Sequence, residues 1–232
     1  MLNNEIYNNI LSSHYSKNKR SPEYYVEFIE KYLKNKYKKI LYLKDEVVLK
    51  EDIVDDYFYF IEKGKVVLTK QNYYGKKSCY GYLTEGDFFG YSAFSYLSEV
   101  VGYKALTNCY IYAIEVKAAK ELVSQSEEFK NEVHYIFVDT LRTLTLRQGS
   151  LASGECKTSF VNFIFEYFKN YSKIDEKGNI VVNLDLTLSQ IAEILNMTRE
   201  TLSRILAEMK KDKIIETKRK YIKILDLSRF IV

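Results

Sequence analysis

Residues 188–206 read LSQIAEILNMTRETLSRIL, and the second half of this stretch decides what the C-terminal part of the chain is. A helix advances by about 100° per residue, so side chains that share one face can be found from their spacing. Within an arc of roughly 140° lie four polar residues, Arg199, Glu200, Ser203 and Arg204. On the opposite side lie four apolar residues, Leu202, Ile205, Leu206 and Met209. The spacing predicts an amphipathic helix with one face for packing and one face free to contact a partner.

The polar face carries side chains of the kind that read base edges in DNA. Arginine matches the two acceptors of guanine in the major groove, and glutamate accepts from the amino group of cytosine. An ordinary solvated face is the alternative, since Glu200 and Arg204 have the i, i+4 spacing of a surface ion pair. The segment that precedes the helix decides between the two.

That segment predicts a second short helix and a tight turn. Thr187 and Gln190 have the spacing of a capping box, so a helix should begin near Leu188. Asn196 tolerates left-handed backbone and fits the turn, and Thr198 is a natural N-cap for the next helix. Two short helices joined in this way form a helix-turn-helix, whose second helix enters the major groove of DNA.

A basic hairpin follows the second helix. Residues 213–217 and 221–225 predict two β-segments around a basic turn at 218–220. Residues 199–223 hold nine Lys and Arg against four Asp and Glu, a net charge of +5, whereas the whole chain carries only +4. The positive charge is thus concentrated where DNA would lie. We expect contacts to backbone phosphates, which position a protein without specifying sequence, from Thr187, Ser189, Gln190, Thr198, Lys218, Arg219 and Lys220.

The stretch 188–206 resembles the winged helix-turn-helix of the CRP/FNR family of bacterial transcription regulators. Upstream, YFYFIEKGKV at 57–66 and LTEGDFFG at 83–90 resemble the sensory β-roll of the same family. The resemblance covers nearly the full chain and implies a homodimer bound to double-stranded DNA, with RNA polymerase as a further partner. It also implies that bases are contacted by the residues at the matching positions, Arg199, Glu200, Ser203 and Arg204.

The fold class follows from length and pattern. The 232 residues exceed the usual single domain, and residues 40–115 read as short alternating β-segments without long helices between them. This predicts an α+β protein with an N-terminal antiparallel β-roll of the jelly-roll kind, a long dimerisation helix and a C-terminal winged helix-turn-helix. The expected boundaries are 1–126 for a cyclic-nucleotide-binding-like sensory domain, 127–152 for the dimerisation helix and hinge, and 153–232 for the DNA-binding domain.

The predicted long helix carries an apolar stripe. Its members are Phe129, Val133, Ile136, Phe137, Thr140 and Leu144. We expect this stripe to form a two-fold dimer interface; the alternative is that it covers the roll. A dimer would present two recognition helices about one DNA turn apart and would require a palindromic operator.

The sensory segment departs from the cyclic-nucleotide binders of the family at two ligand-holding positions. In those members a glutamate holds the ribose and an arginine holds the cyclic phosphate. Here the matching residues are Tyr91 and Glu99, and no arginine occurs between Arg20 and Arg142. A carboxylate repels phosphate, and lysine lacks the bidentate fork of arginine. The sequence therefore argues against cyclic AMP or cyclic GMP as the effector.

Aromatic residues gather where the ligand pocket of the family lies. The chain has 22 Tyr and 13 Phe, and the expected pocket residues are Tyr82, Phe89, Tyr91, Phe94, Glu99 and Tyr103. Two interpretations stay open. Either an unidentified small-molecule effector, apolar, aromatic or thiol-bearing, occupies the pocket, or the aromatic rings fill it themselves.

The sequence has no motif for a cofactor, a metal site, catalysis or a membrane span. Cys79, Cys109 and Cys156 are too few and too widely spaced for a four-cysteine iron–sulfur cluster, and the two histidines identify no haem ligand, so we expect neither cofactor nor metal. Nucleophile–base pairs and phosphate loops are absent, so we expect no enzyme. Without a signal peptide or an apolar run near the ~20 residues that span a bilayer, we expect a cytoplasmic protein with no membrane partner.

Two other functions remain alternatives. One is a small-molecule or redox sensor that acts through protein contacts and has vestigial DNA binding. The other is a regulator that needs no effector.

Overall fold

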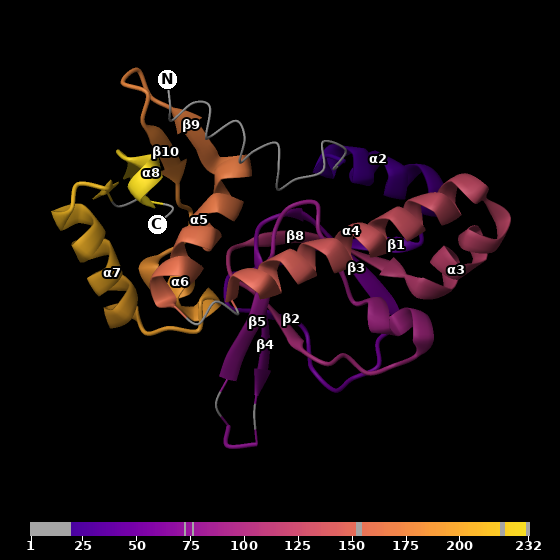
Figure 1. Ribbon diagram of the computed structural model, residues 1–232. Helices are drawn as coiled ribbons and strands as arrows, with labels where there is room; N and C mark the ends of the chain where they lie inside the picture. Colours follow the sequence, from indigo (N-terminus) through magenta and orange to yellow (C-terminus); the bar gives the residue numbers. More distant parts are fainter. Residues whose placement is uncertain (1–19, 72, 76, 152–154, 219–220, 231–232) are drawn as a thin grey trace. The chain divides into compact units, whose positions relative to one another are not determined.

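The computed structural model describes residues 20–71, 73–75, 77–151, 155–218 and 221–230. The chain divides into two compact units, Arg20–Gln148 and a second unit that takes in Gly149–Val232 (Figure 1). Mixed helix and strand content, with an antiparallel sheet domain, a long helix and a helix-turn-helix in that order, confirms the predicted α+β class.

Two four-stranded sheets form the roll of the first unit. The strand orders are β1-β8-β3-β6 and β2-β7-β4-β5, and every neighbouring pair is antiparallel. The strands are β1 (Tyr37–Tyr42), β2 (Val47–Leu49), β3 (Tyr57–Lys63), β4 (Val66–Gln71), β5 (Lys77–Leu83), β6 (Phe88–Phe89), β7 (Gly102–Ala105) and β8 (Cys109–Glu115). A 3₁₀ helix, η1 (Tyr91–Ser95), follows β6.

Strand β3 is apolar on both faces because both faces of its sheet are covered. Successive side chains of a strand point to opposite faces. Tyr59 and Ile61 pack inside the roll with Leu68, Phe89 and Ile111. Their neighbours pack with the helices on the outer face, in a cluster that includes Phe58, Phe60, Phe88, Tyr112 and Ile114. The continuous run YFYFI thus reflects a strand buried between two layers.

Three helices cover that outer face, α2 (Pro22–Leu33), α3 (Val116–Gln125) and α4 (Glu127–Leu151). Helix α2 begins at Pro22 after its N-cap Ser21, whose side chain accepts from the backbone N–H of Tyr24. Helices α2 and α4 lie side by side (Figure 1), with the rings of Phe28 and Phe129 stacked at 5.3 Å. Arg20 also binds the carboxylate of Glu132 on α4, at 2.7 Å.

Most of the stripe predicted as the dimer interface packs on the roll of its own chain, which is the alternative that the sequence left open. Phe129, Val133 and Ile136 are only 1%, 7% and 6% exposed and belong to the cluster between α2, α4 and the sheet. Phe137 and Thr140 contact Tyr91, and Leu144 is half-buried. Periodicity identified a face that becomes buried, but it cannot say which surface covers that face.

Two exposed apolar residues of α4 lie elsewhere on the helix. Val138 is 65% exposed and Leu141 is 66% exposed. They are three residues apart, so they are neighbours on one helix face. His134, one turn earlier, is exposed as well. This strip of α4, residues 134, 138 and 141, is called the outer face of α4 below.

The second unit is a small helical domain with its own sheet. Its elements are α5 (Cys156–Tyr171), β9 (Ser172–Ile174), β10 (Ile180–Asn183), α6 (Leu188–Ile194), α7 (Arg199–Lys211), β11 (Ile215–Lys218), β12 (Tyr221–Ile224) and α8 (Leu227–Phe230). The sheet order is β11-β12-β10-β9, antiparallel throughout. Phe160, Ile191, Leu202, Leu227 and Phe230 are completely buried and form the centre of the domain.

The described part of the chain has neither a helix that could cross a membrane nor a cluster of potential metal ligands. None of its helices has the length and apolar character required to cross a bilayer. No group of three or more His, Cys, Asp or Glu within it is arranged to hold a metal ion.

Candidate functional site

The start of α6 is fixed by the capping box that the sequence predicts. The hydroxyl of Thr187 accepts from the backbone N–H of Gln190 at 3.3 Å, and Oε1 of Gln190 accepts from the backbone N–H of Thr187 at 2.8 Å. The capping box thereby satisfies two backbone donors at the helix start. The predicted box and the start at Leu188 are confirmed.

The turn between α6 and α7 also forms as expected. Asn196 has φ 51°, in the left-handed region where asparagine costs little. The backbone N–H of Met197 donates to the carbonyl of Ala192 at 3.0 Å. Thr198 caps α7, because its hydroxyl accepts from the backbone N–H of Thr201 at 3.1 Å. The two helices therefore form a helix-turn-helix.

Helix α7 separates its two faces as the spacing predicts. Leu202, Ile205, Leu206 and Met209 are buried. On the other side Arg199, Glu200, Ser203 and Arg204 are all exposed. The exposed four are called the reading face below. Hydrogen bonds from its own backbone N–H and from the Thr198 hydroxyl lower the pKa of Glu200, so its carboxylate is ionised and held at the start of α7.

The residues expected to contact phosphate fall into three groups. Thr187, Ser189, Thr198 and Lys218 are exposed around the same helices and hairpin. Gln190 is only 9% exposed and its side-chain oxygen is engaged in the capping box, so its role is better assigned to the helix start. Arg219 and Lys220 lie outside the described residues.

The hairpin β11–β12 is the predicted wing. Lys218 pairs with Tyr221 at its outer end, and Glu216 pairs with Lys223. Lys223 binds the carboxylate of Asp175 at 2.5 Å, which ties the wing to the turn between β9 and β10. The pKa of Asp175 is held well below its ordinary value by Lys223 and by N–H groups of Asn179 and Lys177. Lys223 is therefore assigned to the stability of the domain and not to DNA contact.

In the roll, the segment that follows β6 is used for packing. Gly90 has φ 80°, and a Cβ there would stand 2.9 Å from the ring of Tyr59, so this position requires glycine. The next residue, Tyr91, joins its hydroxyl to that of Thr140 on α4 at 2.6 Å. Its ring packs on Phe137 at 4.7 Å. The side chain expected at the ribose position thus links η1 to α4.

Five of the six residues predicted to line an effector pocket separate into two groups. Phe89 and Tyr103 stack at 4.6 Å inside the roll, beside Glu99. Tyr91 and Phe94 instead pack against Phe137 of α4. Tyr82 is buried on β5. Phe89 and Tyr91 lie on either side of the tight Gly90 turn, which explains why neighbours in sequence reach different layers.

Glu99 is the one carboxylate of the predicted pocket, and it is 4% exposed. Its Oε2 accepts from the hydroxyl of Tyr103 at 3.3 Å. Burial raises the pKa of Glu99, and hydrogen bonds from Ser92 and Tyr103 oppose that rise. The loop that carries Glu99 is held by backbone hydrogen bonds to Asp52 and Ile53, at 2.7 and 2.9 Å.

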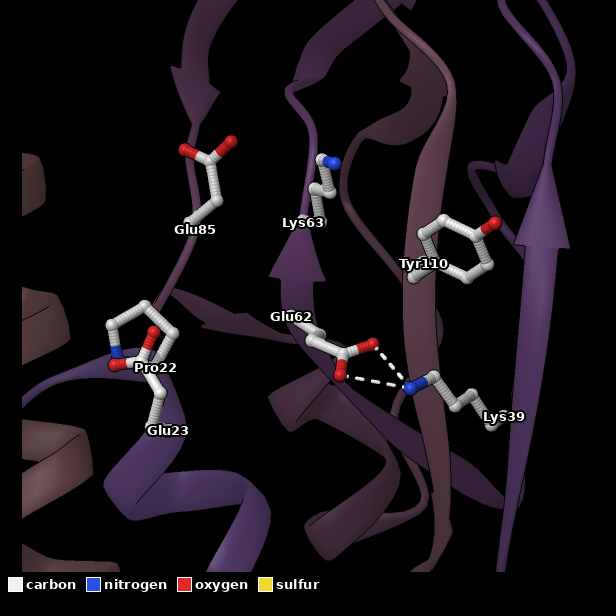
Figure 2. A pocket seen from close by; sticks show the side chains of 7 residues that line it. All are labelled: Pro22, Glu23, Lys39, Glu62, Lys63, Glu85 and Tyr110. Atoms are coloured by element: carbon white, nitrogen blue, oxygen red, sulfur yellow. Dashed lines mark hydrogen bonds and ion pairs between the residues drawn. The ribbon is translucent and has the colours of Figure 1, made fainter. Parts of the chain in front are cut away.

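A surface hollow of about 550 Å³ lies outside the roll and was missed by sequence reasoning. Its lining comes from five separate segments of the chain, with Pro22, Glu23, Lys39, Glu62, Lys63, Glu85 and Tyr110. Figure 2 shows Lys39 paired with both carboxylate oxygens of Glu62, at 2.8 and 2.6 Å. Lys63 and Glu85 point away from that pair (Figure 2). With its charges mixed and partly neutralised, the hollow presents no set of groups that converge on one ligand.

Two family models match the chain, one in each compact unit. The model of the cyclic nucleotide-binding domain matches residues 39–126, and the model of the Crp-like helix-turn-helix domain matches residues 162–231. The chain belongs to the CRP/FNR family of transcription regulators. It is a DNA-binding regulator with a cyclic-nucleotide-binding-like sensory domain, and the family is not a class of enzymes.

Known members of the CRP/FNR family and related folds are similar over most of the chain. The cAMP-activated global transcriptional regulator Vfr of Pseudomonas aeruginosa is 23% identical over 167 residues, which cover 70% of this chain and 77% of Vfr. The structure of FixK2 from Bradyrhizobium japonicum matches with a TM-score of 0.71 at 18% identity, over 84% of this chain and 95% of FixK2. The c-di-GMP-responsive regulator CLP of Xanthomonas campestris matches with a TM-score of 0.67 at 18% identity, over 86% and 98% of the two chains. The two structures show that the fold is shared.

Proposed function

We propose that the protein is a homodimeric, sequence-specific transcription regulator that binds a palindromic operator and is controlled through its roll by an effector other than a cyclic nucleotide. The observation that carries this proposal is the reading face of α7. Two arginines, a glutamate and a serine are exposed together on a helix whose other face is fully packed. CRP/FNR regulators bind DNA and typically dimerise.

On the operator, α7 enters the major groove with its N-terminal half against the base edges. Arg199 and Arg204 donate to guanine, Glu200 accepts from cytosine, and Ser203 makes a more permissive contact. Phosphates on either side are contacted by Thr187, Ser189, Thr198 and Lys218, together with Arg219 and Lys220 of the wing turn. These phosphate contacts set the register of the protein and contribute the salt-dependent part of the affinity.

The dimer forms through the outer face of α4. Val138 and Leu141 are large apolar side chains, about two-thirds exposed, on a helix whose opposite face is packed on the roll. An isologous contact between two copies of this helix would bury them and would relate two reading faces by a two-fold axis. A palindromic operator follows from that symmetry. RNA polymerase is a further expected partner, to which no residue is assigned.

The roll lacks the two side chains that would hold a cyclic nucleotide, so we infer that the effector is of another kind. Vfr is cAMP-activated and CLP responds to c-di-GMP. In this chain the ribose position holds Tyr91, which is bonded to Thr140, and the phosphate position holds the buried Glu99. Recognition of a cyclic phosphate would place its charge against a carboxylate, with no arginine between Arg20 and Arg142 to offset it.

A regulator that needs no effector is the second candidate, and the contact between Tyr91 and Thr140 favours it. This 2.6 Å hydrogen bond and the packing of Tyr91 on Phe137 already connect the roll to α4 with no ligand between them. An effector-independent protein would bind its operator equally well whatever metabolites are present.

Selection of bound fragments from a random DNA pool tests the proposal. The purified protein should enrich a palindrome with G·C pairs in each half-site, with half-site centres about 10 base pairs apart. Enrichment of no sequence, with binding that depends on salt alone, would contradict it.

A further inference from the structure

A buried carboxylate oxygen inside the roll has no partner. Among the described residues, Oε1 of Glu99 is a buried side-chain oxygen without a hydrogen bond, although the residue is only 4% exposed. A buried acceptor left without a donor costs free energy, and a buried charge costs more. The other oxygen, Oε2, is already held by the hydroxyl of Tyr103. Tyr103 and Ser92 therefore orient Glu99, while its Oε1 makes no hydrogen bond of ordinary geometry.

The surrounding charges do not neutralise Glu99. Asp55 raises the pKa of Glu99 further, so the two carboxylates repel each other. Asp55 itself is satisfied, because it accepts from the hydroxyl of Tyr59 at 2.7 Å and from backbone N–H groups. Lys104 lies next to Tyr103 on β7, so its side chain points to the opposite face of the sheet, where it is 3.9 Å from Asp45. Among the described residues, no salt bridge joins Glu99 to a lysine or an arginine.

Open space lies on the same interior face. Gly81 of β5 is buried, yet no atom described in the structure, apart from its chain neighbours, lies within 4 Å of where a Cβ would stand. Leu68 of β4 pairs with Gly81 on one side and with Tyr103 on the other. Directly paired residues point to the same face of a sheet, so the space at Gly81 and the ring of Tyr103 share the interior. Two strand spacings place them about 10 Å apart.

The wall between these two points is aromatic. Phe89 stacks on Tyr103 at 4.6 Å and on Tyr59 at 4.9 Å. The interior thus offers a flat apolar surface, open space beside Gly81 at one side and a carboxylate acceptor at the other. An aromatic or aliphatic body with one cationic donor matches all three features.

We propose that the interior of the roll binds a small organic ammonium ion, whose apolar body lies along Phe89 and Tyr103 and whose nitrogen donates to Oε1 of Glu99. This assignment rests on the proposed function, because it names the chemical class of the effector. A site built on a carboxylate requires a positively charged ligand, whereas a cyclic phosphate is negatively charged and requires a cation in its site. An amine supplies the donor that Oε1 lacks and the positive charge that the carboxylate requires.

The test compares small probes of different charge. Tyramine is the aromatic cation, and phenol and 4-hydroxyphenylacetate are its neutral and anionic counterparts; hexylamine supplies the cation on an aliphatic body. Binding to the full-length protein is followed by calorimetry and thermal unfolding near neutral pH. We expect saturable binding and a raised melting temperature with an amine, and neither with phenol, 4-hydroxyphenylacetate or cyclic AMP.

Two variants test whether amine binding depends on Glu99. Glu99→Gln keeps the shape and removes the charge, so we expect it to weaken amine binding by about tenfold or more. It should also raise the melting temperature of the unliganded protein, because an unpaired buried charge is removed. A carboxylate that only holds Tyr103 and Ser92 in place would give a lowered melting temperature instead. Glu23→Gln, on the wall of the outer hollow, is the matched control and should leave binding unchanged.

The pH dependence gives a readout that needs no variant. Protonation of Glu99, which faces Tyr103, Ser92 and Asp55, removes the negative charge, so amine affinity should fall as the pH is lowered through the raised pKa of this carboxyl. The proposal is overturned if neither amine binds saturably at millimolar concentration, if the anion binds better, or if Glu99→Gln leaves amine affinity unchanged. Operator binding is measured separately. Intact operator binding with no amine response refutes this inference alone, whereas loss of sequence selection in the wild type refutes the proposed function.

Discussion

Replacing Tyr91 by phenylalanine tests how the roll is joined to α4. The ring that packs on Phe137 at 4.7 Å is retained, and only the hydroxyl that lies 2.6 Å from Oγ1 of Thr140 is lost. A neutral hydrogen bond of this kind contributes about 0.5–1.5 kcal/mol, and Thr140 is half-buried, so water replaces only part of the loss. We therefore expect Tyr91→Phe to lower the free energy of unfolding of the roll by about 1 kcal/mol.

A double-mutant cycle isolates the bond from other effects of the substitution. Thr140→Val removes the partner hydroxyl, and the coupling free energy between the two changes should be about 0.5–1.5 kcal/mol. Urea unfolding followed by circular dichroism measures each variant. Tyr110→Phe is the matched control, since Tyr110 is 41% exposed, and should be neutral. A coupling free energy of zero would refute the claim that this hydrogen bond joins η1 to α4.

Three further results are expected from single substitutions. Val138→Glu or Leu141→Glu on the outer face of α4 should turn the dimer into a monomer in sedimentation experiments without lowering the stability of the roll; a stable dimer in both variants would rule out this interface. Lys218→Ala should weaken binding to all DNA sequences alike and reduce the salt dependence by about one counterion, and a change in base preference would contradict its phosphate role. The pKa of Asp175 is lowered in the folded state, so its pairing with Lys223 stabilises the fold above the ordinary carboxyl pKa near 4 and is lost as the pH falls below it. Asp175→Asn should therefore lower the free energy of unfolding at neutral pH, and the variant should lose less stability than the wild type as the pH falls. Unfolding measured at several pH values checks this, and a pH dependence equal to that of the wild type would disprove the effect.

The local features of the DNA-binding domain were predictable because local rules determine them. The capping box at Thr187 and Gln190, the left-handed turn at Asn196 and the two faces of α7 each depend on residues a few positions apart. The same holds for the strands of the roll. The family resemblance then supplied the order of the domains, which the two matched models confirm.

The tertiary partners of each face were not predictable in the same way. The stripe on α4 was identified correctly as apolar, but it packs on the roll, and the exposed pair Val138 and Leu141 has too few members to be noticed in sequence. The predicted pocket separates at Gly90, because one tight turn sends Phe89 inward and Tyr91 toward α4. Such contacts depend on how elements far apart in the sequence pack against each other, and the pattern of a single sequence does not specify that packing.

The base preference of Arg204→Ala, compared with that of the wild type in the same selection from random DNA, tests the central claim most directly. If the reading face of α7 contacts base edges, the variant should lose preference at one position in each half-site, at a cost of about 1–3 kcal/mol in binding, while the other positions and the half-site spacing stay unchanged. An unchanged preference at every position would contradict the assignment of Arg204, and with it the claim that this exposed face reads the operator.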